Sequence, residues 1–264
     1  MAEAIVRGVR IHYERLGAIG NRVRVVFVHG FIVDNLAGFY FTMAGAVAPF
    51  ADTLLYDLRG HGQSERSPTG YRVADMAADL DELTRAVFGP EPMCLVGNSF
   101  GAIVAVEFAR RFIDRLSGLV FIDGHLGGAD FASTMVRTLS MRGTEADQAI
   151  AESFRLWPGQ TSERKTRKLA EQANALVMRT SLVADMGATR PLAAEEFAAI
   201  DVPVLAIYGE QSDLLAGVRG PLEAMPRASL VVLPGCTHSV LWEAKEEVRA
   251  RLVAFCRGLE RAAA

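Results

Sequence analysis

A serine flanked by two glycines is the feature of this sequence most able to do chemistry. Residues 97–101 read Gly-Asn-Ser-Phe-Gly, directly after an apolar run at residues 93–96 and before a helical stretch that ends near residue 112. A serine in this setting is forced into a tight turn between strand and helix, and the glycines leave room for the crossing backbone. The Ser99 hydroxyl is therefore predicted to project from the turn as a nucleophile, at the positive end of the helix.

Such a hydroxyl is weak by itself and needs a base that is oriented by a third group. Among the five histidines, His238 lies in a loop between the last predicted strand and the last predicted helix, and it is the predicted base. His125 follows another strand end and is the alternative base. The remaining histidines are expected to shape the backbone or serve structure: His12, His29 and His61.

The predicted acid is Asp213, in the loop that follows the penultimate core strand. It lies between Ser99 and His238 along the chain. The order serine, acid, histidine is the one expected when the serine lies in a tight turn between a strand and a helix. Asp123, in Phe-Ile-Asp-Gly, also follows a strand and is the second choice, and Glu210 is the third. Only geometry decides between these carboxylates.

Attack by a serine places negative charge on a substrate oxygen, which preorganised N–H groups stabilise. The backbone N–H of Phe100, next after the serine, is one expected donor of this oxyanion hole. The N–H of Phe31, after His29-Gly30, is the other. An ordinary tight turn is the alternative interpretation of His29-Gly30-Phe31.

The pattern along the chain predicts a mostly parallel, doubly wound α/β sheet with one inserted helical cap. Two alternating runs around Gly8 indicate an early antiparallel pair, and six short apolar runs indicate strands covered on both faces. These runs are residues 23–28, 53–58, 93–96, 119–122, 204–208 and 230–233, with helices expected over 73–87, 101–112 and 240–259. Strands that alternate with helices place their chemistry at the carboxyl edge. The core is predicted over 1–126 and 191–264, and the cap over 127–190.

The composition of the chain limits the classes of partner that it is expected to bind. The chain of 264 residues has a formal net charge of -3 and is 50% hydrophobic, which disfavours nucleic acid and anionic membranes as partners. Three widely spaced cysteines predict free thiols in a reducing compartment, and no metal or cofactor is expected. The N-terminus lacks the pattern of a secretory signal, so a cytoplasmic location is expected.

At these residues the chain resembles the α/β-hydrolase superfamily. The resemblance rests on His29-Gly30, the Tyr-Asp-Leu-Arg-Gly-His-Gly-Gln-Ser run at 56–64, the serine turn, Asp213 and His238, and covers about residues 20–125 and 200–260. It implies an esterase-like mechanism with an acyl-enzyme on Ser99, and a structural role for residues 57–64. Two departures stand out. Ala102 stands where many members of the superfamily have another glycine. Asn98, just before the serine, resembles the residue of carbon–carbon bond hydrolases at this position, where esterases more often have histidine.

The expected substrate is a small acyl compound, apolar or ring-bearing, because apolar side chains are predicted to wall the pocket. Besides the two phenylalanines above, these are Ile32, Trp157, Leu182, Met186 and Trp242. A basic cluster at residues 163–168 could dock an acyl carrier protein or a coenzyme A thioester, which would favour a thioesterase. A solvated helix face is the alternative.

Three functions remain open on this sequence. The first is hydrolysis of a carboxylic ester or thioester. The second uses the same three residues for carbon–carbon bond hydrolysis, acyl transfer or cyclisation. The third is ligand binding with little turnover, which an intact set of serine, histidine and aspartate disfavours.

Overall fold

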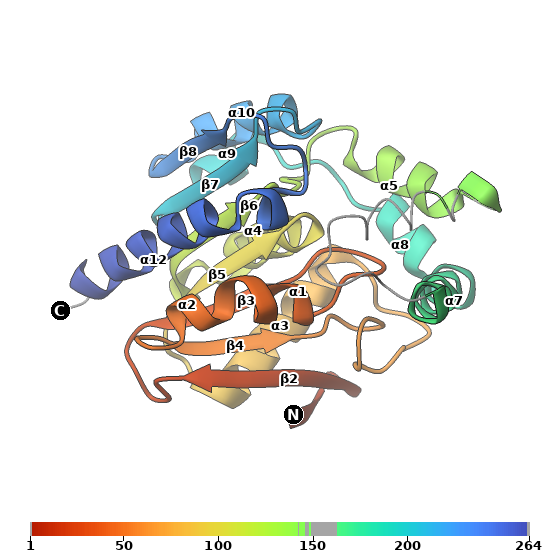
Figure 1. The fold of residues 1–264 in the computed structure, drawn as a ribbon, viewed down its shortest axis with the longest axis horizontal. Coiled ribbons are helices and arrows are strands. Elements are labelled where there is room, and N and C mark those ends of the chain that lie inside the picture. The colour runs from red at the N-terminus through yellow and green to blue at the C-terminus, as the bar shows by residue number, and fades with distance from the viewer. Residues whose placement is uncertain (1, 142, 146–147, 149–162, 263–264) are drawn as a thin grey trace.

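The computed structural model describes residues 2–141, 143–145, 148 and 163–262, and Figure 1 shows their arrangement. Within these residues eight strands form one sheet in the order β1-β2-β4-β3-β5-β6-β7-β8. β1 pairs with β2 and β2 with β4 antiparallel, and the other neighbours are parallel. The strands are β1 (Ala2–Val6), β2 (Val9–Gly17), β3 (Arg24–Val28), β4 (Asp52–Tyr56), β5 (Met93–Asn98), β6 (Leu116–Ile122), β7 (Val204–Gly209) and β8 (Ala228–Leu233). The predicted mostly parallel sheet is confirmed.

Two of the three helices predicted by range, over residues 73–87 and 101–112, are confirmed. The helices of the described residues are α1 (Ala37–Phe39), the π-helix η1 (Tyr40–Ala44), α2 (Gly45–Val47), α3 (Val73–Phe88), α4 (Phe100–Phe112), the 3₁₀-helix η2 (Ile113–Arg115), α5 (Phe131–Ser140), α7 (Glu163–Arg179), α8 (Leu182–Gly187), α9 (Ala194–Ala198), α10 (Leu215–Ala224), α11 (Val240–Glu243) and α12 (Lys245–Ala262). The single helix expected over 240–259 is two, because Ala244 leaves the helical region at φ -124° and ψ 37°.

The sheet is buried on both faces, which explains why its parallel strands read as continuous apolar runs. Alternate residues of β3 point to opposite sides: Val26 and Val28 join one core cluster, and Val25 and Phe27 the other. The first cluster includes residues of α3 and α4, and the second includes residues of η1 and α12. The carboxyl ends of the strands therefore rest on a core that is packed on both sides.

Three helices of the predicted cap lie on the side of the sheet toward which β5 and β7 point (Figure 1). These are α5, α7 and α8, and all fall within residues 127–190. Hydrogen bonds tie α8 to the core, since Ser181 N–H donates to Pro68 O at 2.9 Å and Tyr71 N–H donates to Asp185 Oδ2 at 2.9 Å. The boundaries of the cap stay a prediction.

The loop after β4 is organised around one buried carboxylate, Asp57. Its oxygens accept hydrogen bonds from His12 Nδ1 at 2.9 Å, from Leu36 N–H at 2.9 Å and from Gln63 N–H at 2.8 Å. A Cβ on Gly62, whose φ is 51°, would lie 2.3 Å from that carboxylate. The loop after β4 and the segment after β3 are thus held together at the carboxyl edge of the sheet.

Candidate active site

Ser99 occupies a strained turn between β5 and α4. Its backbone has φ 50° and ψ -117°, a conformation that costs energy for any residue with a side chain. A Cβ on Gly101 would lie 2.0 Å from the carbonyl oxygen of Val28, and one on Gly97 would lie 2.6 Å from the backbone nitrogen of Ala102. Both glycines are therefore required by backbone that passes at close range, as the five-residue motif predicts.

His238 joins Ser99 to a buried carboxylate. The histidine lies between β8 and α11, and its Nε2 is 3.1 Å from Ser99 Oγ. Its Nδ1 is 2.9 Å from Asp123 Oδ1. An ionised carboxylate can only accept, so Nδ1 carries the proton and Nε2 is free to accept from the serine hydroxyl. The ring is thereby held in the tautomer that a general base needs.

Asp123 is completely buried at the end of β6, in a left-handed conformation with φ 42°. Besides the histidine, it accepts hydrogen bonds from Gly209 N–H at 2.7 Å and from Ser212 Oγ at 2.5 Å. A buried charge is tolerated only when it is paired and hydrogen-bonded, and these three donors meet that requirement. Asp123 is held in place by the loop that follows β7.

The structure corrects the expected contact between His238 and Asp213. Asp213 is exposed, and it is Ser212 that turns inward from the loop after β7. The carboxylate that contacts His238 Nδ1 therefore follows β6 and does not come from the loop after β7. Glu210, the third choice, is also exposed and accepts from Gly235 N–H at 2.9 Å.

The two expected oxyanion donors lie on segments that flank Ser99. A Cβ on Gly30 would be 3.5 Å from Ser99 Cβ, which places the segment after β3 against the serine. Within the described residues, neither Phe31 N–H nor Phe100 N–H donates to a protein acceptor. Their rings stack with centroids 4.1 Å apart. Both N–H groups are therefore available, as an oxyanion hole requires.

His61 and His29 support the segment after β3, in keeping with the structural roles expected of them. His61 Nε2 accepts from Ile32 N–H at 3.0 Å, and its Nδ1 donates to Arg59 O at 2.9 Å. His29 Nε2 accepts from Leu58 N–H at 3.0 Å. Ile32 has φ 64°, a strained value for a β-branched residue, so the bond from His61 helps to hold the turn after Phe31.

The burial of His61 leads to a prediction about stability. Burial, with the nearby His29, lowers the pKa of His61 from 6.5 to about 3. Below pH 6.5 the unfolded chain binds a proton at this residue and the folded chain does not. The contribution of His61 to the free energy of unfolding is therefore at its full value above that pH and falls as the pH drops toward 3. In urea unfolding, the part of the free energy of unfolding that is due to His61 should fall by about 2 kcal/mol between pH 7 and pH 5.

The matched variant is His61→Gln, because an amide oxygen can still accept from Ile32 N–H and does not titrate. Its free energy of unfolding should fall less between pH 7 and pH 5 than that of the wild type. An identical pH dependence in both proteins would show that His61 is not held neutral in the fold.

His125, the alternative base, does not contact the serine hydroxyl. Its backbone N–H donates to Ser99 O at 3.1 Å, and its ring lies edge-on to Phe131 with centroids 5.3 Å apart. Burial, and then His238, lowers the pKa of His125 to about 4, against the opposing charges of Asp213 and Asp123. The geometry therefore favours His238 as the base.

The two departures from the family pattern have structural explanations. Asn98 Nδ2 donates to Ile122 O at 2.8 Å, so this amide links the ends of β5 and β6. The methyl group of Ala102 fills the space over Gly124, where an added Cβ would lie 2.1 Å away. The Cβ methyl group of Ala102 in α4 is therefore accommodated because Gly124, after β6, has no Cβ.

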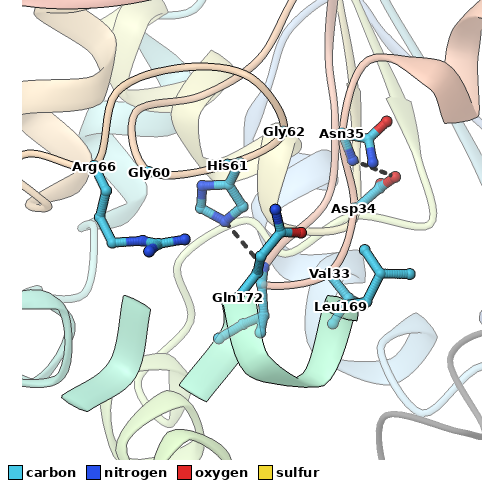
Figure 2. Close-up of a pocket in the computed structure, with 10 residues that line it drawn as sticks. Val33, Asp34, Asn35, Gly60, His61, Gly62, Arg66, Leu169 and Gln172 are labelled. Atoms are coloured by element: carbon cyan, nitrogen blue, oxygen red, sulfur yellow. Dashed lines mark hydrogen bonds between the residues drawn. The ribbon is translucent and has the colours of Figure 1, made fainter. Parts of the chain in front are cut away.

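A pocket opens at residues 32–35, in the segment that follows β3 (Figure 2). It is formed by the segment after β3, the loop after β4 and the helix α7. Its lining comprises Ile32, Val33, Asp34, Asn35, Gly60, His61, Gly62, Arg66, Leu169 and Gln172. No sequence pattern had marked Arg66, Asn35 or Gln172, because the three lie far apart in the chain.

The predicted wall residues separate into different environments. Ile32 lines the pocket of Figure 2. Leu182 and Met186 are completely buried in the larger core cluster, and Trp242 packs half-buried against the other cluster. Trp157 lies outside the described residues.

A model of the alpha/beta hydrolase family matches residues 25–251. The chain belongs to this family. The "Putative carbamate hydrolase RutD" of Cronobacter sakazakii is 27% identical over 146 residues, which cover 53% of this chain and 54% of that protein. The "Proline iminopeptidase" of Thermoplasma volcanium is 21% identical over 95% of this α/β-hydrolase and 94% of its own length.

Solved structures share the fold of this α/β-hydrolase. A thermophilic esterase from Thermogutta terrifontis superposes with a TM-score of 0.79 at 21% identity, covering 98% of both chains.

In the basic cluster of α7, Arg167 and Lys168 are exposed, and Arg167 pairs with Glu171 at 3.8 Å. Docking of a carrier there stays a prediction. Across the described residues no helix has the length and apolar composition needed to cross a bilayer.

Proposed function

We propose that this α/β-hydrolase is a serine hydrolase that cleaves a carboxylic ester or thioester of a small, largely apolar acyl compound. The observation that carries the proposal is the unbroken run of contacts from Ser99 Oγ through His238 to Asp123. This arrangement supplies a nucleophile, a base in the required tautomer and a buried carboxylate to stabilise the imidazolium.

In the first half of the reaction, Ser99 Oγ attacks the acyl carbon while His238 Nε2 takes the hydroxyl proton. The charge on the acyl oxygen is stabilised by the N–H groups of Phe31 and Phe100. When the tetrahedral intermediate collapses, His238 returns the proton to the leaving oxygen or sulfur, and an ester links the acyl group to Ser99.

In the second half, water attacks the acyl-enzyme and His238 takes its proton. The intermediate collapses to the free acid, and the proton returns to Ser99. Asp123 keeps its negative charge throughout and pairs with the imidazolium that forms at each step. The Asp123 end of this pair is buried and poorly screened by solvent, whereas the His238 side chain is 44% exposed.

The experiment is covalent labelling with a fluorophosphonate probe together with turnover of ethyl pentanoate. We expect one adduct, mapped by mass spectrometry to Ser99, and hydrolysis that the probe abolishes. Labelling of another residue, or turnover that survives full labelling of Ser99, would contradict the proposal. Two relatives are named as a carbamate hydrolase and a proline iminopeptidase, so a carbamate and a proline amide are useful further substrates.

A further inference from the structure

The pocket of Figure 2 differs in chemistry from an apolar acyl site. Guanidinium and amide side chains from three separate segments line it: Arg66 from the loop after β4, Gln172 from α7, and Asn35 from the segment after β3, on the far side of the pocket from Arg66. We infer that this pocket binds a carboxylate of the substrate, with Arg66 as its cation. The inference rests on the proposed function and adds a charged group to the substrate class.

The charge of Arg66 is available for a ligand. Among the described residues its guanidinium makes no hydrogen bond or ion pair, and Figure 2 shows it extended into the pocket toward His61 and Gln172. Some other guanidinium groups among the described residues are paired with carboxylates. Arg59, for example, makes a bidentate pair with buried Asp79, with both N···O distances 2.6 Å. A guanidinium presents planar donors that match a carboxylate.

The acidic residue of the lining does not cancel this charge. Asp34 lies across the pocket from Arg66 in Figure 2. Its Oδ2 accepts from Gly30 N–H at 2.8 Å and its Oδ1 from Asn35 N–H at 2.8 Å. Both oxygens are therefore engaged by backbone N–H groups of the segment after β3, and neither is paired with the Arg66 guanidinium.

The neutral side chains also offer more donors than acceptors. Asn35 Oδ1 accepts from Ala37 N–H at 2.9 Å, and the NH₂ group of Asn35 has no acceptor within the part of the chain that the structure describes. The amide of Gln172 has no hydrogen-bond partner among the described residues and lies over His61 in Figure 2. The imidazole of His61 is occupied at both nitrogens. A pocket with a free cation and free N–H donors fits a ligand that only accepts hydrogen bonds, which is what a carboxylate does.

The pocket lies within reach of the serine. Ile32 belongs to its lining, and Gly30, two residues earlier, approaches Ser99 Cβ to 3.5 Å when a Cβ is added. Two residues of extended chain span at most about 7 Å, so the backbone of Ile32 at the pocket wall lies within roughly 12 Å of Ser99 Cβ. A short acyl chain with a terminal carboxylate would occupy both places. Its apolar middle agrees with the proposed substrate class.

The test is the charge preference of ester hydrolysis. Monoethyl succinate, glutarate and adipate are compared with uncharged ethyl pentanoate, and kcat/KM is measured by pH-stat titration. Arg66→Gln should lower the ratio of kcat/KM for the best monoester over ethyl pentanoate by about tenfold, mainly through KM. Arg66→Lys, which keeps the charge but loses the planar fork, should restore part of the ratio.

Arg22→Gln is the matched control, because Arg22 is exposed just before β3, at the opposite edge of the sheet. It removes the same charge and should leave the ratio unchanged. An equal fall in the ratio with Arg22→Gln would mean that only the net charge matters, and an unchanged ratio with Arg66→Gln would mean that Arg66 does not bind the carboxylate. Either result overturns the inference.

Binding separates this inference from the proposed function. Calorimetric titration with glutarate needs no turnover, and Arg66→Gln should weaken that binding about tenfold relative to the wild type. Glutarate binding that depends on Arg66 in a protein that hydrolyses no ester would retain the pocket and reject the serine chemistry. Ester hydrolysis with neither a charge preference nor Arg66-dependent glutarate binding would retain the serine chemistry and reject the carboxylate pocket.

Discussion

Asp123→Asn is expected to lower kcat for ethyl pentanoate by about 10⁴-fold with little change in KM. An asparagine amide at this position would present N–H to His238 Nδ1, or else lose the contact. The imidazole would then favour the tautomer with its proton on Nε2, where it cannot accept the proton of Ser99. The loss of the negative charge also removes the partner of the imidazolium that forms during the reaction.

Asp213→Asn is the matched variant, since the same change of group is made on the neighbouring loop. Asp213 is exposed and does not contact His238, so its kcat should stay within about twofold of the wild type. A large loss in Asp213→Asn, with near-normal turnover in Asp123→Asn, would return the acid to the loop after β7.

Asp123 also organises that loop, so the fold of the Asn variant must be checked. Gly209 N–H and Ser212 Oγ both donate to its carboxylate. Urea unfolding shows whether the variant stays folded, and Ser212→Ala supplies a second comparison. Ser212→Ala removes one donor to Asp123 but leaves the carboxylate beside His238, so a kcat loss far smaller than that of Asp123→Asn is expected.

Ser99→Ala is expected to lower kcat by about 10⁶-fold, the largest effect of any substitution considered for this chain. The variant lacks the oxygen that would form the acyl-enzyme, while His238 and Asp123 keep their contact. The remaining rate would come from the oxyanion donors and from substrate binding alone, because the residues of such a triad act as a unit. The measurement is ethyl pentanoate turnover at high enzyme concentration.

Ser133→Ala controls for the loss of a serine hydroxyl elsewhere. Ser133 is exposed on α5, and its Oγ donates to Asp130 O at 3.0 Å. Its turnover and its fluorophosphonate labelling should match those of the wild type. If Ser99→Ala kept more than a small fraction of the rate after purification to homogeneity, another nucleophile would have to carry the reaction.

The short motifs explain why much of this site could be predicted from the sequence. The turn at Ser99 depends on residues within two positions of it, since glycines at 97 and 101 admit the crossing backbone. His238 could be selected because the loop after the last parallel strand must open at the carboxyl edge. The sheet itself follows from the spacing of apolar runs, whose period and length distinguish buried strands from helices.

Tertiary structure decided which carboxylate meets the histidine. Asp123 and Asp213 both follow parallel strands at the same edge, and their local patterns are equally suitable. The choice depends on the left-handed turn at Asp123 and on Ser212 pointing inward, so that three donors surround the carboxylate from β6. Such side-chain directions arise from the packing of two loops against each other and leave no periodic pattern in either loop.

The sequence by itself thus determined the family of folds, the strained serine and the histidine that contacts it, because each depends on local backbone geometry or on strand order. Only the tertiary structure decided the burial of Leu182 and Met186 and the placement of Arg66, Asn35 and Gln172 around one pocket. Those placements depend on how α7 and α8 pack over loops more than a hundred residues earlier in the chain, and contacts of that range are not encoded in the spacing of neighbouring residues.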